Sequence, residues 1–98
     1  MIVRIVKLTF HQENIVSFLK IFEESKNRIR SSDGCSFVEL YQDTSNASVF
    51  FTYSYWDSAD DLENYRNSDF FRSVWAKTKR LFSEKPEAWS VKKLQSLT

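Results

Sequence analysis

The segment Ser48–Trp56 constrains the fold of this chain most strongly, because it is the most apolar and aromatic run in the sequence. Its residue types, chiefly Val, Phe, Tyr, Thr and Trp, favour β-strands. The side chains of a strand alternate between two faces, and a strand covered on one side only shows one polar face. Here both faces carry bulky side chains, which predicts a central strand in a sheet covered on both sides. One face has Val49, Phe51, Tyr53 and Tyr55, and the other has Phe50, Thr52, Ser54 and Trp56.

Two other regions show the periodicity of helices. From Ile15 to about Arg30, apolar side chains recur every three or four positions, which predicts an amphipathic helix. Gly34, the only glycine, follows this helix and indicates a position with positive φ. A second helical region begins at Ser58, a helix N-cap signal with an acid three residues later. Residues 67–69 interrupt that region, and Ser68 can cap a second helical segment. The apolar face of this segment runs from Phe71 to Phe82, and Pro86 closes the region.

Three more strands complete the predicted order of elements. They are Ile2–Phe10, Ser36–Asp43 and Ala88–Leu94, and turn-forming residues after the second predict a hairpin into the central strand. The order strand, helix, strand, strand, helix pair, strand is the ferredoxin-like split β-α-β pattern. The sequence thus predicts a single α+β domain over residues 1–98, with a four-stranded antiparallel sheet and helices on one face.

No helix is left to cover the second face of that sheet. This face includes Val49, Phe51, Tyr53 and Tyr55, and burying four such side chains is worth about 6–12 kcal/mol. We therefore expect a second copy of the chain to supply the cover, as a two-fold homodimer that places sheet against sheet.

The charge balance and the hydropathy of the chain disfavour several classes of partner. With 14 basic and 13 acidic residues the formal net charge is +1, which gives no electrostatic reason to expect nucleic acid or an anionic membrane. No apolar run approaches the roughly 18 residues of a membrane span, and no signal-peptide pattern is present. We expect a cytoplasmic protein.

Few residues could bind a metal ion or act as a general base. The chain has one histidine, His11, and one cysteine, Cys35, which excludes sites built from several of either. The acidic cluster within Asp57–Glu63 could hold a cation, but acids also belong in the first turn of a helix, and we favour that interpretation. The sequence identifies no cofactor, no metal site and no catalytic residue.

Aromatic residues are the remaining candidates for a site. Trp56 and Trp75, with Tyr65 and Phe71 near them in the sequence, could line an apolar pocket between the helices and the sheet. An apolar pocket with a few polar groups is the usual form of a small-molecule site. The same residues could also be ordinary core, and the sequence leaves both interpretations open.

Several segments together resemble one known family. The runs Phe51–Ser58, Leu62–Tyr65 and Ser68–Phe71, with the strand at Ile2-Val3 and the position of Gly34, are similar to the antibiotic biosynthesis monooxygenase-like family. The resemblance spans nearly the whole chain. It implies a dimeric α+β barrel with a pocket between the sheet and the helices of each subunit. Members include cofactor-independent oxygenases of aromatic polyketides, quinol monooxygenases and haem-degrading enzymes.

Position by position, this chain matches the residues of these enzymes unevenly. Trp56 matches the tryptophan that lines the pocket of the polyketide oxygenases, whereas Thr52 stands at their asparagine and Leu62 at their tyrosine. The axial histidine of the haem-degrading enzymes corresponds to Trp75, which cannot ligate iron, so haem degradation is not expected. A substrate pocket of this kind would use Trp56, Phe71 and Trp75 as its apolar wall and Thr52 or Tyr65 to orient a phenol oxygen.

Three functions follow as hypotheses. The first is a monooxygenase that needs no cofactor and acts on a small aromatic, phenolic or quinol-like compound. The second is a non-catalytic dimeric barrel that binds a small apolar ligand or a partner protein. The third, an RNA-binding module with the same strand order, is disfavoured because the Arg/Lys-Gly-aromatic signature of such modules is missing.

Overall fold

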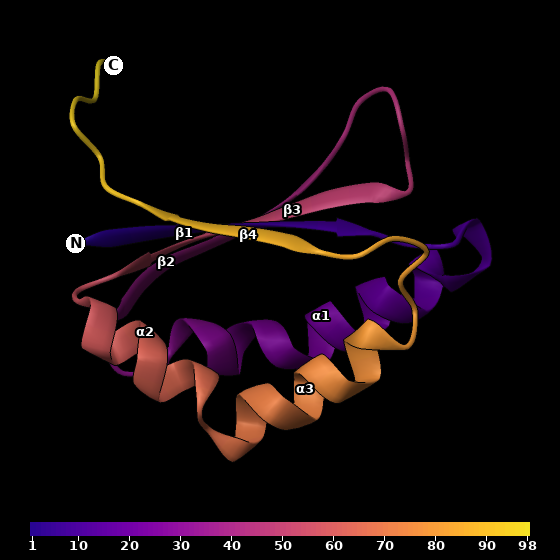
Figure 1. The fold of residues 1–98 in the computed structure, drawn as a ribbon, viewed down its shortest axis with the longest axis horizontal. Coiled ribbons are helices and arrows are strands. Elements are labelled where there is room, and N and C mark those ends of the chain that lie inside the picture. Colours follow the sequence, from indigo (N-terminus) through magenta and orange to yellow (C-terminus); the bar gives the residue numbers. More distant parts are fainter.

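A layer of helices covers one face of a single four-stranded sheet in the computed structural model, which describes residues 1–98 (Figure 1). The order of strands in the sheet is β2-β3-β1-β4, and every neighbouring pair is antiparallel. This is the α+β ferredoxin-like fold that the sequence predicts. The strands are β1 (Ile2–Thr9), β2 (Cys35–Gln42), β3 (Val49–Trp56) and β4 (Glu87–Val91), and the helices are η1 (Gln12–Asn14), α1 (Ile15–Arg30), α2 (Ala59–Arg66) and α3 (Asp69–Lys79).

The predicted central strand, β3, lies between β2 and β1. Its inner side chains point to the helices, where Phe50 is 2 % exposed and Trp56 is 1 % exposed. Phe50 packs with Phe10 of the segment after β1 and Phe18 of α1. Burial of these rings against the helices explains why the helix layer is held on this face of the sheet.

Serine caps set the break between α2 and α3. The Ser58 hydroxyl accepts a hydrogen bond from the Asp61 backbone N–H at 3.1 Å, and the Ser68 hydroxyl accepts one from the Phe71 backbone N–H at 3.1 Å. Both satisfy helix N–H groups that have no partner within the helix. As the sequence predicts, Gly34 has positive φ, +82°, and a Cβ there would collide with the Asp61 side chain. The turn before β2 therefore packs closely against the start of α2.

Two elements end more than one residue away from the sequence prediction. The last strand spans Glu87–Val91 and not Ala88–Leu94. Val91 pairs with Val3, so Leu94 in the same register would stand opposite a position before Met1, and it is 81 % exposed. The second correction concerns Phe82, which lies beyond the end of α3 at Lys79. It still reaches the core, because it bridges to Phe10.

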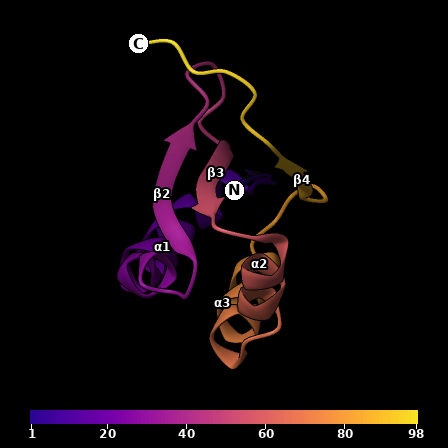
Figure 2. The ribbon, with the colours of Figure 1, turned by 90° about the vertical axis from the view of Figure 1, so that its left-hand side faces the viewer.

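The opposite face of the sheet carries no helix. In Figure 1 the helices lie below the sheet, whereas the β2–β3 loop and the C-terminal tail rise on the other side, and Figure 2 shows the same separation from the end. We call this surface the bare face. It holds the outward rings of three strands, and Phe37 stacks on Tyr55 with centroids 4.4 Å apart. Its rings are half-buried or exposed, and Trp89 of β4 is 43 % exposed.

Candidate functional site

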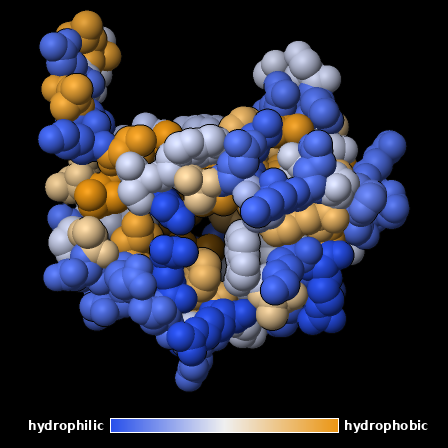
Figure 3. Space-filling view, viewed as in Figure 1, coloured by the Kyte–Doolittle hydropathy of each residue, from blue (hydrophilic) through white to orange (hydrophobic).

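A cleft of about 220 Å³ lies between the inner face of the sheet and the helices α2 and α3. A second cavity of about 120 Å³ adjoins it and shares four lining residues with it: Val6, Ser54, Phe71 and Trp75. Together the two volumes reach the lower end of the range for small-molecule sites, roughly 300 Å³. Figure 3 shows a hollow between the two layers, with hydrophobic atoms inside it and hydrophilic residues at its rim. The cleft is lined by Arg4, Val6, Ser54, Trp56, Leu62, Arg66, Phe71, Trp75, Pro86 and Ala88.

Small side chains on the sheet create this space. Arg4 of β1 pairs with Ser54 of β3 on one side and with Ser90 of β4 on the other. One step along the sheet, Val6 lies between Thr52 and Ala88. Because neighbours in register on one face contact each other, these small residues leave a low floor beneath α2 and α3.

Aromatic rings form the walls of the cleft. The Trp56 indole N–H donates a hydrogen bond to the Ser54 hydroxyl at 3.0 Å, which orients the ring and satisfies its only donor. Phe71 and Trp75 lie one turn apart on α3 and stack with centroids 5.9 Å apart and planes 11° apart. A flat apolar ligand would therefore meet the rings of Phe71 and Trp75 on the helix side, and Trp56, which is 1 % exposed, closes the cleft on the sheet side.

The structure brings together four of the five residues predicted as a substrate pocket. Trp56, Phe71 and Trp75 line the cleft, and Thr52 lines the adjoining cavity. Tyr65 lines neither. It packs against Trp56 with centroids 4.8 Å apart, and burial raises the pKa of its phenol well above the usual value. It therefore stays protonated and acts as a support for Trp56.

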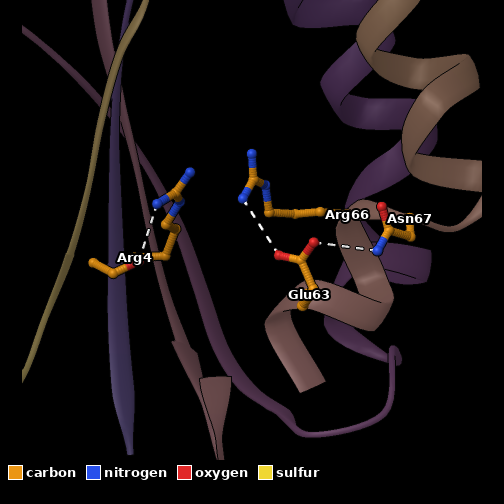
Figure 4. A network of polar contacts seen from close by, with 5 residues as sticks. Arg4, Glu63, Arg66 and Asn67 are labelled. Atoms are coloured by element: carbon orange, nitrogen blue, oxygen red, sulfur yellow. Dashed lines mark hydrogen bonds and ion pairs between the residues drawn. The ribbon is translucent and has the colours of Figure 1, made fainter. Parts of the chain in front are cut away.

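Two arginines at the cleft were not among the residues predicted from the sequence. Arg4 of β1 and Arg66 of α2 point toward one another across the cleft (Figure 4). The Arg4 Nη1 donates a hydrogen bond to the Ser90 hydroxyl at 3.0 Å, and the Arg66 Nη1 lies 3.6 Å from a Glu63 carboxylate oxygen. The signal in the sequence was the position of Arg4 among the apolar inward residues of its strand, such as Val6 and Leu8.

No carboxylate, imidazole or thiol lines either cavity. His11 is exposed at the far end of β1, where its backbone N–H bonds to Leu81. Cys35 packs behind Trp56 in a separate cluster, and burial raises the pKa of its thiol. No group of three or more His, Cys, Asp and Glu side chains is placed to hold a metal ion. The cleft thus offers aromatic surface, hydroxyls and guanidinium groups.

A larger hollow of about 660 Å³ lies elsewhere, between the end of α1 and the helix α2. It includes Asn27, Arg28 and Asp61, and only 2 of its 10 lining residues are hydrophobic. A polar depression of this kind offers little to an aromatic ligand. We therefore take the cleft beside Trp56 as the candidate site, although its volume is smaller than that of the polar hollow.

Both the sequence and the fold of this chain are similar to those of known proteins. Residues 1–77 match the family model described as antibiotic biosynthesis monooxygenase, and no curated protein matches the chain. A solved structure described as an antibiotic biosynthesis monooxygenase has a TM-score of 0.90 at 15 % identity, covering 97 % of this chain and 100 % of that one.

Two further solved structures have nearly the same fold. A conserved protein from Methanosarcina mazei has a TM-score of 0.88 at 18 % identity, covering 95 % of this chain and 93 % of that one. A Mycobacterium tuberculosis protein has a TM-score of 0.89 at 14 % identity, covering 99 % and 98 %. At such identities these structures support the fold alone. None of the helices in this chain has the length and apolar character needed to span a bilayer.

Proposed function

Because this chain belongs to the antibiotic biosynthesis monooxygenase family, we propose that it oxidises a small aromatic, phenolic or quinol-like compound with dioxygen and without an added cofactor. The observation that carries the proposal is the convergence of Trp56, Phe71 and Trp75 on one cleft. Flat aromatic walls of this kind suit a ring-shaped substrate and exclude bulk water from it.

The proposed reaction balances without an external reductant. A phenol with one free ring position and one O₂ give a quinone and one water. One oxygen atom replaces the ring hydrogen, and the other leaves as water with that hydrogen and the phenolic proton. The substrate supplies all four electrons that reduce O₂. The residues of the cleft then have to bind the substrate, orient it and favour its ionised form.

The polar groups of the cavities suit the orienting step. The Thr52 hydroxyl lies in the adjoining cavity, where it can donate a hydrogen bond to a substrate oxygen. The Ser54 hydroxyl already accepts from Trp56 and keeps its own proton free to donate. Because no side chain that could act as a base lines the cleft, the proton of the substrate passes to water in this scheme.

We also propose that the active species is a homodimer formed through the bare face. Phe37, Tyr53 and Tyr55 form a cluster of packed rings on it. Trp89 of β4 is 43 % exposed on the same face, with Ile5 of β1 between it and Tyr53. The carboxylate of Glu39 on this face already accepts a hydrogen bond from the Tyr41 hydroxyl. A second sheet laid on these rings would bury apolar area, and the aliphatic part of Lys93, whose ammonium group lies over the Tyr55 ring, would be covered with them.

One observation favours a second candidate, ligand binding without turnover. The lining contains no carboxylate, imidazole or thiol that could take a proton, and proton transfer by a positioned group normally contributes about 10²–10⁴-fold to a rate. A binding protein would show thermal stabilisation by aromatic ligands with no product formed.

Oxygen uptake tests the proposal. We expect the purified protein, with a chelator present, to consume one O₂ per molecule of a 1-naphthol or hydroquinone substrate. Trp56→Phe should lower the rate by about tenfold or more, because a displaced substrate reacts poorly. Val16→Ala, at an exposed position of α1 that lines neither cavity, should leave the rate unaltered. Absence of turnover above the uncatalysed rate across a panel of phenols and quinols would contradict the oxygenase and leave the binding protein.

A further inference from the structure

The cleft holds more positive charge than the contacts around it neutralise. None of the three ion pairs in the structure includes Arg4, whose hydrogen-bond partner is the uncharged Ser90 hydroxyl. Arg66 lies 3.6 Å from Glu63, longer than the roughly 2.7–2.9 Å of a strong charged hydrogen bond. Glu63 also accepts from the Asn67 side chain at 3.2 Å. The two arginines and Glu63 together carry a net charge of +1.

Two effects of the surroundings disfavour the positive charge of Arg4. Burial lowers the pKa of Arg4, the neighbouring Arg66 lowers it further, and Glu63 partly opposes both effects. An unpaired guanidinium at the wall of an apolar cleft loses hydration without gaining a counter-charge. An anion between the two arginines would relieve both the desolvation and the mutual repulsion.

The two arginines line the same cleft as the aromatic rings, so an anion held between them would lie next to those rings. Arg4 rises from the cleft floor between Ser54 and Ser90, and Arg66 faces it from the end of α2. On β3, Trp56 lies two residues after Ser54, the partner of Arg4, and points to the same side of the sheet. Ring and guanidinium surfaces therefore line the same space. A ligand that fills the cleft would meet both.

We propose that the cleft binds an aromatic carboxylate, with its ring against Trp56, Phe71 and Trp75 and its carboxylate between Arg4 and Arg66. The planar guanidinium donates two parallel N–H groups, a geometry that matches a carboxylate. The net charge of +1 fits a monoanion better than a doubly charged phosphate. This inference rests on the proposed function, for which it names the substrate class as hydroxylated aromatic acids.

Binding of two nearly identical ligands tests the inference without any turnover. The ligands are 1-hydroxy-2-naphthoate and its neutral amide, 1-hydroxy-2-naphthamide, each titrated into the full-length protein by calorimetry at low salt. We expect the carboxylate to bind at least about tenfold more tightly, since a hydrogen bond to a charged group is stronger than one to a neutral group. The preference should shrink as salt is raised. Equal affinity for the two ligands, or tighter binding of the amide, would overturn the proposal.

Variants assign the preference to the two arginines. Arg4→Gln should abolish the preference for the carboxylate and Arg66→Gln should reduce it, whereas Arg4→Lys should keep part of it. Arg80→Gln is the matched control, because Arg80 is exposed at the end of α3 and donates only to the Ala76 carbonyl of its own helix. Melting curves show that each variant is folded. A full carboxylate preference in folded Arg4→Gln would overturn the proposal.

The outcome separates this inference from the oxygenase. If the protein prefers the carboxylate through Arg4 yet consumes no oxygen, the anion site stands and the oxygenase fails. If neutral quinols are oxidised and folded Arg4→Gln handles the acid and the amide as the parent protein does, the oxygenase stands and the anion site fails.

Discussion

The two faces of β3 carry similar aromatic side chains that reach different environments. On the inner face, Phe50 and Trp56 are 2 % and 1 % exposed beneath the helices. On the bare face, Phe51, Tyr53 and Tyr55 remain half-buried, although they alternate with the inner residues along the same strand. Residue type therefore does not decide which ring becomes core. The layer that folds over each face decides it.

This difference also separates two roles within the molecule. The inner face is completed by the chain's own helices, which leave a cleft where Ser54, Thr52 and Ala88 are small. The bare face has no helix to complete it, and the rings of Phe37, Tyr53 and Tyr55 pack together on it. We infer that the first face is for a ligand and the second is for another copy of the chain. The following predictions test that division.

The largest expected effect is on the core of the inner face. Phe50→Ala should lower the free energy of unfolding by about 3–5 kcal/mol, because the ring is fully buried and packs on Phe10 and Phe18. Urea unfolding measures the loss. Its control is the neighbouring Phe51→Ala, whose effect should depend on protein concentration, because a second chain would cover that ring in the proposed homodimer. Equal, concentration-independent losses for both variants would remove the distinction between the faces.

A charge on the bare face should separate the subunits. Tyr53→Lys places a charge among the packed rings of Phe37 and Tyr55, and we expect it to weaken dimerisation by about 2 kcal/mol, roughly thirtyfold in affinity. Sedimentation over a range of concentrations measures the shift from two chains to one. Val16→Lys is the control, because Val16 is 79 % exposed on α1. If the parent protein sediments as a single chain at every concentration, the proposed homodimer is wrong.

The smallest effect concerns Tyr65 and appears only at alkaline pH. Burial raises the pKa of the folded phenol, whereas an unfolded tyrosine ionises near pH 10. The unfolded chain therefore loses this proton first, and the contribution of Tyr65 to stability is present below about pH 10 and lost as pH rises above it. We expect Tyr65→Phe to lose less stability than the parent protein between pH 9 and pH 11, measured by urea unfolding at each pH. Parallel curves for the two proteins would show that the folded phenol ionises normally.

Much of the fold could be predicted because its signals are local. Alternation over Ser48–Trp56, the helical spacing after Ile15 and the N-caps Ser58 and Ser68 each act within a few residues. These signals place the elements in order and identify β3 as the central strand. The last strand was predicted too long, because its end depends on where β1 runs out of pairing partners and not on its own residues.

The candidate site could be predicted only in part. Trp56, Phe71 and Trp75 were found because large aromatic residues near the sheet and on α3 stand out in the sequence. Tyr65 was included for the same reason, yet the position of α2 directs its ring to the back of Trp56. Arg66 was missed because a charged residue at the end of a helix normally lies in solvent.

The sequence by itself determined the order of elements, the central strand, the helix caps and the surplus of aromatic side chains, since each depends on neighbours a few positions apart. Only the tertiary structure decided that Arg4 stands between Ser54 and Ser90 and faces Arg66 across an aromatic cleft. Strand register and helix placement bring together distant residues such as Arg4 and Ser90, which are 86 positions apart. Such contacts arise from the packing of whole elements, which no short stretch of sequence specifies.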